Sequence, residues 1–445
     1  MADSQLGHTL RQRDFIFDPA YIPLNHGSYG AFPKVVRDRQ RELQDLTEGR
    51  SDHFIRYSIP QLLRESRDAV APLLGVPTEE VVFVPNATTA VNTVLRNLDY
   101  RAGDIIVYFS TAYGACEKTI QHVCETTAAE SYRIPLVYPF EDEDLIDLFR
   151  RTITQLSSGG KRVRLAMFDT VVSFPGVRLP WEGLVGACKD LSVLSLIDGA
   201  HGIGHIDLTH LGRVGPDFFT SNAHKWLYVP RGSAVFHVPK RNWHLIKTSF
   251  PTSRGFTPKE RRGEESADSF GNLFYSVATT DTTPYLCAAS ALEYRSAVLG
   301  GEESIRRYCF DLAKQGGRRM AEILGTEVLD NRSGSLSQCC FTMVRLPLNF
   351  SQGRVSDVEE SNKGASRRLM SEDGPDLVKG IMETLMREHD TWIPGKFFQG
   401  AAWMRVSAQT YLEPADFEWA AEVLQKLCQR VISEDALRRD NGLTM

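Results

Sequence analysis

The middle of the chain alternates short apolar runs with stretches of helical periodicity, and this alternation constrains the fold more than any other feature. The apolar runs, which we predict to be strands, are VVFVP (81–85), DIIVYF (104–109), RLAMFDTVV (164–172), VLSLIDGA (193–200), FFTSN (218–222) and SAVFHVP (233–239). Helical patterns such as TTAVNTVLRNL and WEGLVGACKDL lie between several of them. Strands that are apolar on both faces and alternate with helices indicate a mainly parallel sheet covered by helices, an α/β fold.

The C-terminal third of the chain has a different pattern. A long helical stretch begins near residue 291, and the apolar segments CCFTMVRLPL and WMRVSAQTYL are separated by another one. This pattern predicts a small C-terminal α+β domain over residues 286–445 and a large α/β domain over residues 71–285. Residues 1–70 are predicted to pack on the small domain or on a partner subunit. The polar stretch SQGRVSDVEESNKGASRR (351–368) is predicted to be an exposed loop.

Composition and cysteine spacing exclude several classes of protein. The 445 residues are 42% hydrophobic and 24% charged with a formal net charge of −5, and no Lys/Arg-rich stretch indicates nucleic acid or an anionic membrane. The first residues, MADSQLGHTLRQRDF, lack the apolar core of a secretory signal, so a cytoplasmic protein is expected. The eight cysteines show no paired spacing, which predicts reduced thiols and no metal site. We interpret Cys116 as a small buried side chain.

Polar residues follow several of the predicted strands, at the edge where open α/β sheets bind ligands. After the first strand, PNATTAVN (85–92) places small and hydroxyl-bearing residues at the start of a helix. Backbone N–H groups at such a position stabilise a phosphate. The alternative is that an Asn or Thr in this stretch only caps its own helix.

Two charged residues follow later strands. Asp198, in IDGAHGIG, is expected to be buried and therefore to need a charged partner, although it could instead accept backbone N–H groups in its own turn. Lys225, in SNAHKWLYVPRG, comes one strand later, where partial burial would lower the pKa of its amine and allow bonding to an aldehyde. A phosphate site, a carboxylate and a lysine in this order match the needs of pyridoxal 5′-phosphate (PLP).

Seven motifs spread over nearly the whole chain resemble those of the class V aminotransferases, which are fold-type I PLP enzymes. The motifs are LNHGSYGAFP (24–33), FVPNATTAVNTVLRN (83–97), STAYGACEKTI (110–120), FDTVVSFPGVRLP (168–180), IDGAHGIGHIDL (197–208), SNAHKWLYVPRG (221–232) and WMRVSAQTYLE (403–413). The chain is most similar to the branch of isopenicillin N epimerase-like and cysteine desulfhydrase-like proteins, which includes hercynylcysteine sulfoxide lyases and loline-pathway enzymes. The resemblance implies a large, mainly parallel sheet of the seven-stranded type and a smaller C-terminal α+β domain.

The resemblance also implies roles around the cofactor. Lys225 would bond to the cofactor and move the proton at the substrate's Cα, while Asp198 would hold the pyridine nitrogen protonated. The other implied contacts are Ala87 and Thr88 at the phosphate, Ser221 or His224 as a further phosphate donor, Tyr113 beside the ring and Ser173 near the phenolic oxygen. Tyr113 and His201, which replaces the glutamine of some relatives, are predicted catalytic residues together with Lys225.

A second set of residues is implied to bind the substrate. Arg405 would bind the α-carboxylate, because a guanidinium forms two parallel hydrogen bonds with a carboxylate. Asn25 and His26 would close over that carboxylate or over the cofactor.

Two further residues are predicted to act in a neighbouring subunit. Arg56, in FIRY (54–57), is a candidate substrate contact in the partner's site. Thr279 resembles the threonine that reaches the neighbouring subunit's phosphate, although Ala278 replaces the usual glycine of that element. A homodimer is therefore expected.

The motifs do not specify which bond at Cα is broken, since this depends on which bond the pocket holds perpendicular to the cofactor ring. Our leading hypothesis is a lyase acting on a cysteine-derived or related amino acid, in which Lys225 removes the Cα proton and β-elimination cleaves the C–S bond. The alternative is a secondary-metabolism enzyme that catalyses γ-replacement or cyclisation of the loline type; epimerisation and transamination are less favoured. Persulfide transfer is not expected, because Cys339 and Cys340 precede a predicted strand and not a flexible loop.

Overall fold

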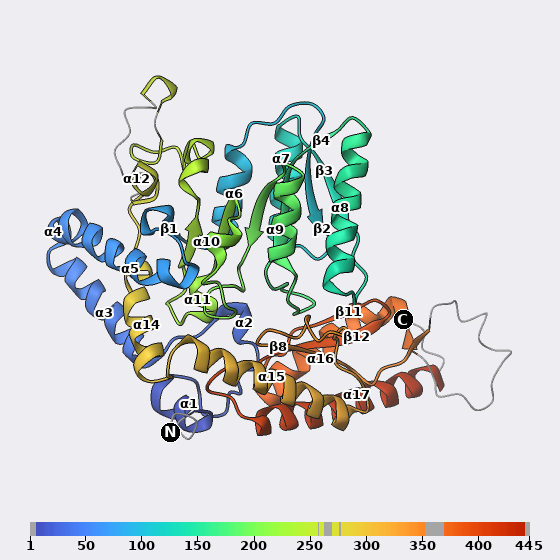
Figure 1. The fold of residues 1–445 in the computed structure, drawn as a ribbon. Coiled ribbons are helices and arrows are strands. Elements are labelled where there is room, and N and C mark those ends of the chain that lie inside the picture. The colour runs from blue at the N-terminus through green and yellow to red at the C-terminus, as the bar shows by residue number, and fades with distance from the viewer. Residues whose placement is uncertain (1–5, 257, 262–268, 276, 352–368, 441–445) are drawn as a thin grey trace. The chain divides into compact units, whose positions relative to one another are not determined.

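The computed structural model describes residues 6–256, 258–261, 269–275, 277–351 and 369–440 (Figure 1). The chain divides into two compact units. The small unit contains residues 1–26, 175–177 and 307–445, and the large unit contains residues 27–174 and 178–306. The three-part division at residues 70 and 285 stays a prediction, and the predicted loop at 351–368 lies, apart from Ser351, outside the described residues.

A seven-stranded sheet forms the centre of the large unit, with strand order β1-β7-β6-β5-β4-β2-β3. The strands are β1 (Val81–Val84), β2 (Asp104–Phe109), β3 (Glu130–Ile134), β4 (Arg162–Asp169), β5 (Leu194–Asp198), β6 (Phe218–Ser221) and β7 (Ala234–His237). Strands β3, β2, β4, β5 and β6 are parallel, and β7 runs antiparallel to both β6 and β1. The predicted mainly parallel α/β sheet is confirmed, and all six predicted strands are present.

Strand β3 was not anticipated by the apolar pattern, and its burial explains why. Its sequence is ESYRI, and its first four side chains are exposed while only Ile134 is buried. It lies at the edge of the sheet beside β2. An edge strand needs no continuous apolar run, because it is not covered on both faces.

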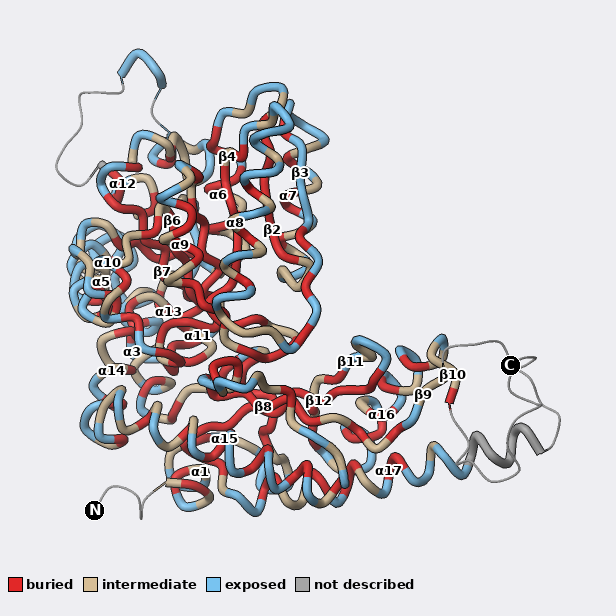
Figure 2. The backbone as a smooth tube through the Cα atoms, turned by 45° about the vertical axis from the view of Figure 1, so that its right-hand side comes forward, coloured by how far each residue is buried: buried red, intermediate tan, exposed pale blue. Residues whose placement is uncertain are grey.

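Helices cover both faces of this sheet. On one face Met167 and Leu196 pack with Ile120 of α7 in a buried apolar cluster that also includes α6. On the other face Phe149 of α8 contacts Phe109, with ring centroids 6.3 Å apart. Complete burial of one such side chain stabilises the folded protein by about 1.5–3 kcal/mol. The strands are buried along most of their length (Figure 2), so packing against helices on both faces stabilises the sheet.

The helices of the large unit are α3 (Lys34–Gly49), α4 (Ser51–His53), the π-helical segment η2 (Phe54–Ser58), α5 (Ile59–Leu74), α6 (Ala87–Asn97), α7 (Gly114–Thr126), α8 (Asp142–Ser158), α9 (Trp181–Asp190), α10 (Leu211–Val214), α11 (Ala223–Trp226), α12 (Ser269–Tyr275), α13 (Thr283–Leu286) and α14 (Ala288–Ala297). Short 3₁₀ turns cover η3 (Thr78–Glu80), η4 (Lys240–Leu245) and η5 (Lys259–Arg261). Helices α2 (His26–Tyr29) and α15 (Glu302–Leu324) contain residues of both units.

The small unit is built on a three-stranded antiparallel sheet in the order β11-β12-β8. Its elements are α1 (His8–Asp14), β8 (Phe341–Arg345), β9 (Phe350–Ser351), β10 (Leu369–Met370), η7 (Ser371–Asp373), α16 (Gly374–His389), β11 (Gly395–Phe398), β12 (Ala401–Ser407) and α17 (Pro414–Asp440). Helices packed with an antiparallel sheet form the α+β architecture predicted for the C-terminal part. Among the described residues no helix is long and apolar enough to cross a membrane, and no cluster of candidate metal ligands is present.

The register of three neighbouring parallel strands brings polar residues to one edge of the large sheet. Asp169 at the end of β4 pairs with Asp198 at the end of β5, and Asp198 pairs with Thr220 of β6. Lys225 follows β6 in the short helix α11. The carboxyl ends of these strands are the place where an open α/β sheet binds ligands, so these residues form the candidate site.

Candidate active site

Asp198 is a buried carboxylate held by two donors. Its side chain is 3% exposed. Oδ1 accepts the backbone N–H of Ala200 at 3.0 Å, and Oδ2 accepts the thiol of Cys116 at 3.3 Å. Burial raises the pKa of Cys116, so this group stays a thiol and donates. An isolated buried carboxylate costs several kcal/mol, and two neutral donors offset only part of that cost, so the site favours a cationic partner for Asp198.

A second acid, Asp169, lies beside Asp198 and was missed by the sequence analysis. Burial, and after it the charge of Asp198, raises the pKa of Asp169 well above its usual range. Two neighbouring carboxyl groups do not both ionise in a buried position, and the proton is favoured on Asp169. The available sequence clue was its place at the end of RLAMFD, at the same edge as Asp198.

Lys225 lies in a compact group of aromatic rings. Its Nζ is 3.2 Å from Nε2 of His201, and the indole N–H of Trp226 donates to Nδ1 of the same histidine at 3.1 Å. His201 and Trp226 are buried, with 2% and 1% of their surface exposed. The predicted catalytic residues Lys225 and His201 are therefore brought together. Trp226, which the sequence predicts to be a packing residue, is also a hydrogen-bond donor to His201.

The N-terminus of α6 follows β1, as predicted for the phosphate site. Asn86 caps the helix, because its Oδ1 accepts the backbone N–H of Thr89 at 2.9 Å, which agrees with the alternative of a simple cap. The backbone N–H of Ala87 donates to Oδ1 of Asn222 at 2.9 Å. Asn222 follows β6, so this bond joins the start of α6 to the turn that carries Lys225. Thr88 lies between these two donors and is half-buried.

The two further phosphate donors proposed from the sequence are engaged with the backbone. The hydroxyl of Ser221 donates to the carbonyl of Gly199, and its oxygen accepts the N–H of Ile203 at 2.8 Å. Nδ1 of His224 lies 2.8 Å from the carbonyl of Ser233, so this nitrogen carries a proton. Burial lowers the pKa of His224 to about 4. Neutral His224 therefore presents an acceptor at Nε2, and its role as a phosphate donor stays a prediction.

The glycine-rich LNHGSYG segment reaches the lysine turn through Gly30. Gly30 has a φ of +64°, and a Cβ at this position would lie 1.7 Å from the carbonyl oxygen of His224. Arg231 donates to the carbonyls of Tyr29 and Gly30 at 3.1 and 2.9 Å. Only glycine permits both this backbone conformation and this approach.

Arg405, the predicted carboxylate-binding residue, lies in the small unit on β12. Its side chain is 2% exposed, its guanidinium carbon lies 4.5 Å from the ring centroid of Phe341, and Nη2 donates to Oδ1 of Asn25 at 3.1 Å. Burial lowers the pKa of Arg405 to about 10. Gly176 makes room for it, because a Cβ there would lie 2.8 Å from Cδ of Arg405. Arg405 and Asn25 are thus brought together as predicted.

His26 and the remaining predicted residues have more varied surroundings. His26 is buried, and its Nδ1 lies 2.6 Å from the hydroxyl of Tyr411 in the small unit. Tyr113 precedes α7 and is 50% exposed, and Ser173 follows β4 and is half-buried. Thr279 is exposed in the segment between α12 and α13.

Arg56, in the π-helical segment η2, is also exposed, and it pairs with Asp52 at 3.2 Å. Cys339 and Cys340 are both buried, which agrees with the interpretation that they are not on a mobile loop.

Comparison with known proteins assigns the chain to a family. A model of the family "Aminotransferase class-V" matches residues 25–344, and the chain belongs to this family. It is 37% identical to the L-cysteine desulfhydrase-like protein lolT2 of Epichloe uncinata, over 95% of this chain and 94% of that protein. It is 27% identical to hercynylcysteine sulfoxide lyase of Schizosaccharomyces pombe, over 96% of this chain and 100% of that protein. A C-DES mutant with glycine covalently linked to its PLP cofactor has a TM-score of 0.72 and 16% identity, covering 91% of this chain and 96% of that structure.

The family and fold predicted from the sequence are confirmed by these comparisons. The roles assigned to individual residues stay predictions. The comparisons name families and folds, whereas the contacts around Asp198, Lys225 and Arg405 are properties of this chain.

Proposed function

We propose that this protein is a PLP-dependent lyase that cleaves a C–S bond in a cysteine-derived or related amino acid. The observation that carries the proposal is the pair formed by buried Asp198 and by Lys225 at the carboxyl ends of neighbouring strands of one parallel sheet. Class V membership and the desulfhydrase-like and sulfoxide lyase relatives support the same chemistry.

The residues present fit PLP. In the part of the chain that the structure describes, the Oδ atoms of Asp198 accept hydrogen bonds from neutral donors, the thiol of Cys116 and the N–H of Ala200, and this suits a protonated pyridine nitrogen as the cationic partner. Lys225 supplies the amine that bonds to the cofactor's aldehyde, and the start of α6 offers the backbone N–H of Thr88 to the phosphate. The N–H of Ala87 is donated to Asn222, so it reaches the phosphate only by exchanging that hydrogen bond. When bound, PLP accepts the electron pair released as a bond at the substrate's Cα breaks.

The residues of the chain then carry the proton and position the substrate. Lys225 takes the proton from Cα on its Nζ, and the C–S bond breaks with its electron pair leaving on sulfur. Arg405 binds the α-carboxylate. The three-carbon product reacts with water to give pyruvate and ammonia, so atoms and charges balance.

Turnover of sulfur amino acids tests this proposal directly. Purified holoprotein mixed with L-cysteine, cysteine S-conjugates or their sulfoxides is expected to release pyruvate and ammonia in equal amounts, together with a thiol, sulfide or sulfenate. Pyruvate is measured with a coupled dehydrogenase. A protein that binds PLP but releases no pyruvate from any of these substrates would exclude C–S β-elimination.

The alternative function is γ-replacement or cyclisation of the loline type, in line with the sequence resemblance and with the 37% identity to lolT2. It shares the Cα deprotonation by Lys225 but needs a leaving group on Cγ. An amino acid with a Cγ leaving group would then be consumed without release of pyruvate. Epimerisation and transamination are less favoured, and a cytoplasmic location stays a prediction from the sequence.

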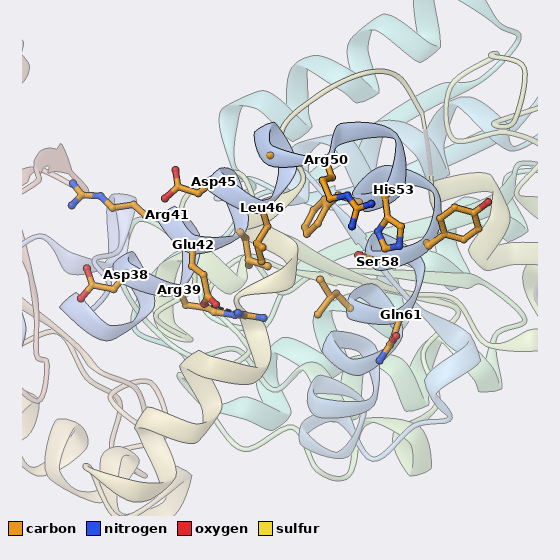
Figure 3. Close-up of a pocket in the computed structure, with 15 residues that line it drawn as sticks. Asp38, Arg39, Arg41, Glu42, Asp45, Leu46, Arg50, His53, Ser58 and Gln61 are labelled. Carbon is orange, nitrogen blue, oxygen red and sulfur yellow. Dashed lines mark hydrogen bonds and ion pairs between the residues drawn. The ribbon is translucent and has the colours of Figure 1, made fainter.

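A homodimer is part of the proposal. A groove of about 1020 Å³ lies between α3, α4, η2 and α5 and is lined by residues that include Arg39, Glu42, His53 and Gln61 (Figure 3). Four large apolar residues of α3 and η2 are exposed, namely Val35, Leu46, Ile55 and Tyr57. Exposed apolar side chains gathered on one segment are typical of a protein contact, and η2 carries Arg56, the predicted partner residue.

Mixed dimers test whether Arg56 acts in the neighbour's site. Lys225→Ala and Arg56→Ala are each expected to reduce activity strongly, whereas their mixture after subunit exchange should recover about one quarter of it, because about half of randomly paired dimers are hybrids with one intact site. A mixture of Lys225→Ala with Asp198→Ala is the control, since both changes affect the same site and no recovery is expected. A monomer in solution, or no recovery in the first mixture, would contradict the prediction.

A further inference from the structure

The proton positions beside Lys225 follow from its contacts with His201 and Trp226. The indole N–H of Trp226 donates to Nδ1 of His201 at 3.1 Å, and an indole nitrogen is a donor only. Nδ1 is therefore unprotonated, and the neutral imidazole carries its proton on Nε2. Nε2 is the nitrogen that lies 3.2 Å from Nζ of Lys225.

We propose that Trp226 is a positioning residue, which fixes His201 as the Nε2–H tautomer so that His201 donates a hydrogen bond to a neutral Lys225 amine. An ammonium group has three donors and no acceptor, so a protonated Lys225 would oppose its N–H groups to the Nε2–H of His201. The neutral amine has the lone pair that attacks an aldehyde or takes a proton from Cα. The proposal rests on the PLP-dependent function proposed above and identifies what keeps its lysine reactive.

The same arrangement determines where the proton goes after Lys225 has taken it from Cα. His201 in the Nε2–H form has no free lone pair facing the lysine, because its other nitrogen already accepts from Trp226. The proton therefore stays on Nζ of Lys225, from which it can return to the substrate or pass to the departing sulfur. His201 acts as a donor to the lysine and does not act as the base.

A third ring holds the indole in place. His205 stacks on Trp226 with ring centroids 4.0 Å apart and an interplanar angle of 26°. Its Nδ1 lies 3.0 Å from the backbone carbonyl of His201, so this nitrogen carries a proton and donates. His205 is fully buried, as Trp226 nearly is, and the pair keeps water away from the Nδ1 side of His201.

The backbone of the two turns is fixed by an ion pair in which the arginine is buried and the glutamate is partly exposed. Arg295 donates to the carbonyl of Trp226 at 2.8 Å and to that of Gly204 at 3.2 Å, and its side chain pairs with Glu302 at 2.6 Å. Burial raises the pKa of Glu302, but the charge and hydrogen bonds of Arg295 outweigh this and hold it below its usual value. One guanidinium therefore binds both the turn that contains His201 and the turn that contains Lys225, and it fixes their positions relative to each other.

Other titratable groups near Lys225 also influence its titration, so their contribution has to be the same in every variant that is compared. Asp169 and Cys116 interact with it electrostatically, and His224 does so from the preceding position. Asp198 lies at the end of β5, which pairs with β6, the strand that precedes Lys225. A Trp226→Phe substitution leaves all four side chains unchanged and removes only the N–H that sets the tautomer, while phenylalanine keeps a ring for His205 to stack on.

The tautomer can be read directly by nitrogen NMR of histidine-labelled holoenzyme. His201, assigned by loss of its signals in His201→Gln, is expected to show a protonated Nε2 and an unprotonated Nδ1. This measurement needs no catalytic turnover, so it separates failure of this proposal from failure of the proposed lyase activity. A protonated Nδ1 on His201 in the unmodified protein would overturn the proposal.

The effect on Lys225 is read from the pH titration of the visible absorption band of the lysine-bound cofactor. Without the indole N–H, His201 can turn its lone pair toward the lysine nitrogen and stabilise that nitrogen's protonated form. The titration midpoint of Trp226→Phe is therefore expected to rise by about 0.5–1 pH unit, the size of one hydrogen bond. The double variant Trp226→Phe/His201→Leu should titrate like His201→Leu alone, because Trp226 acts through His201.

Trp181→Phe is the matched control. Trp181 is a fully buried tryptophan of the same unit, and its Nε1 makes no hydrogen bond among the described residues. Its replacement should leave the midpoint unchanged. Equal midpoints for Trp226→Phe and Trp181→Phe, or a shift of Trp226→Phe to lower pH, would overturn the proposal.

Discussion

Replacing Lys225 by alanine is expected to abolish the visible band of the bound cofactor and to lower turnover of a sulfur amino acid by at least about 10⁴-fold. The change removes two functions at once, since Nζ both bonds to the aldehyde and takes the Cα proton. His201, whose Nε2 lies beside Nζ, keeps its hydrogen bond from Trp226 in the variant, so the loss reports the amine itself. An absorbance spectrum and a pyruvate assay on the same preparation measure both effects.

Two further variants and one added reagent separate these functions from simple loss of charge or of stability. Lys225→Arg keeps a positive charge but no amine of suitable basicity, and it should fail in both assays. Lys240→Ala removes an exposed lysine that lies 5.8 Å from the Trp243 ring, and it should keep the band and the activity. A small primary amine added to Lys225→Ala should restore part of the turnover. A Lys225→Ala protein that keeps the band would show that another residue holds the cofactor.

The sheet could be predicted from the sequence because its central strands are buried on both faces. DIIVYF and RLAMFD are read as strands without knowledge of their partners, since burial on both faces demands an apolar run. Strand β3 could not be predicted from an apolar run, because most of its side chains face solvent and its stabilisation comes from backbone hydrogen bonds with β2. Hydrogen bonds to a neighbouring strand leave no trace in side-chain type.

The candidate site was predictable to the extent that it lies at strand ends. Asp198 and Lys225 each follow a strand, and their order along the chain is the order of β5 and β6 in the sheet. Contacts between residues distant in sequence were not predictable. The thiol of Cys116 donates to Asp198 across 82 positions, and Asn222 accepts from Ala87 across 135.

Trp226 is another residue whose role could not be predicted from the sequence. A tryptophan next to a lysine is read as a packing residue, and its burial agrees with that interpretation. Its polar function depends on a single N–H placed against Nδ1 of His201, 25 positions away. Residue type gives the chemistry that is available, while only the fold decides which donor meets which acceptor.

Replacing Arg405 by alanine is expected to lower kcat/KM for an α-amino acid by about 100-fold to 1,000-fold, mainly through KM, which corresponds to about 3–4 kcal/mol. The guanidinium is buried against Phe341 and held by Asn25, so a carboxylate bound to it would be removed from water. Arg405→Lys should recover only part of the loss, because lysine lacks the planar pair of donors. Because burial lowers the pKa of Arg405 to about 10, substrate binding should also weaken as the pH rises through that value.

Arg345→Ala is the matched control for the Arg405 variant. Arg345 lies on β8 of the same three-stranded sheet, but it is partly exposed and pairs with Glu327 at 3.0 Å, so its loss should leave KM unchanged. The comparison of L-cysteine with cysteamine, which lacks the carboxylate, identifies the group that Arg405 binds. The wild-type protein should strongly prefer L-cysteine, and Arg405→Ala should lose most of that preference. If the variant keeps the full preference for the carboxylate-bearing substrate, another residue binds the carboxylate, and Arg405 serves only to hold Asn25 and the packing around Phe341.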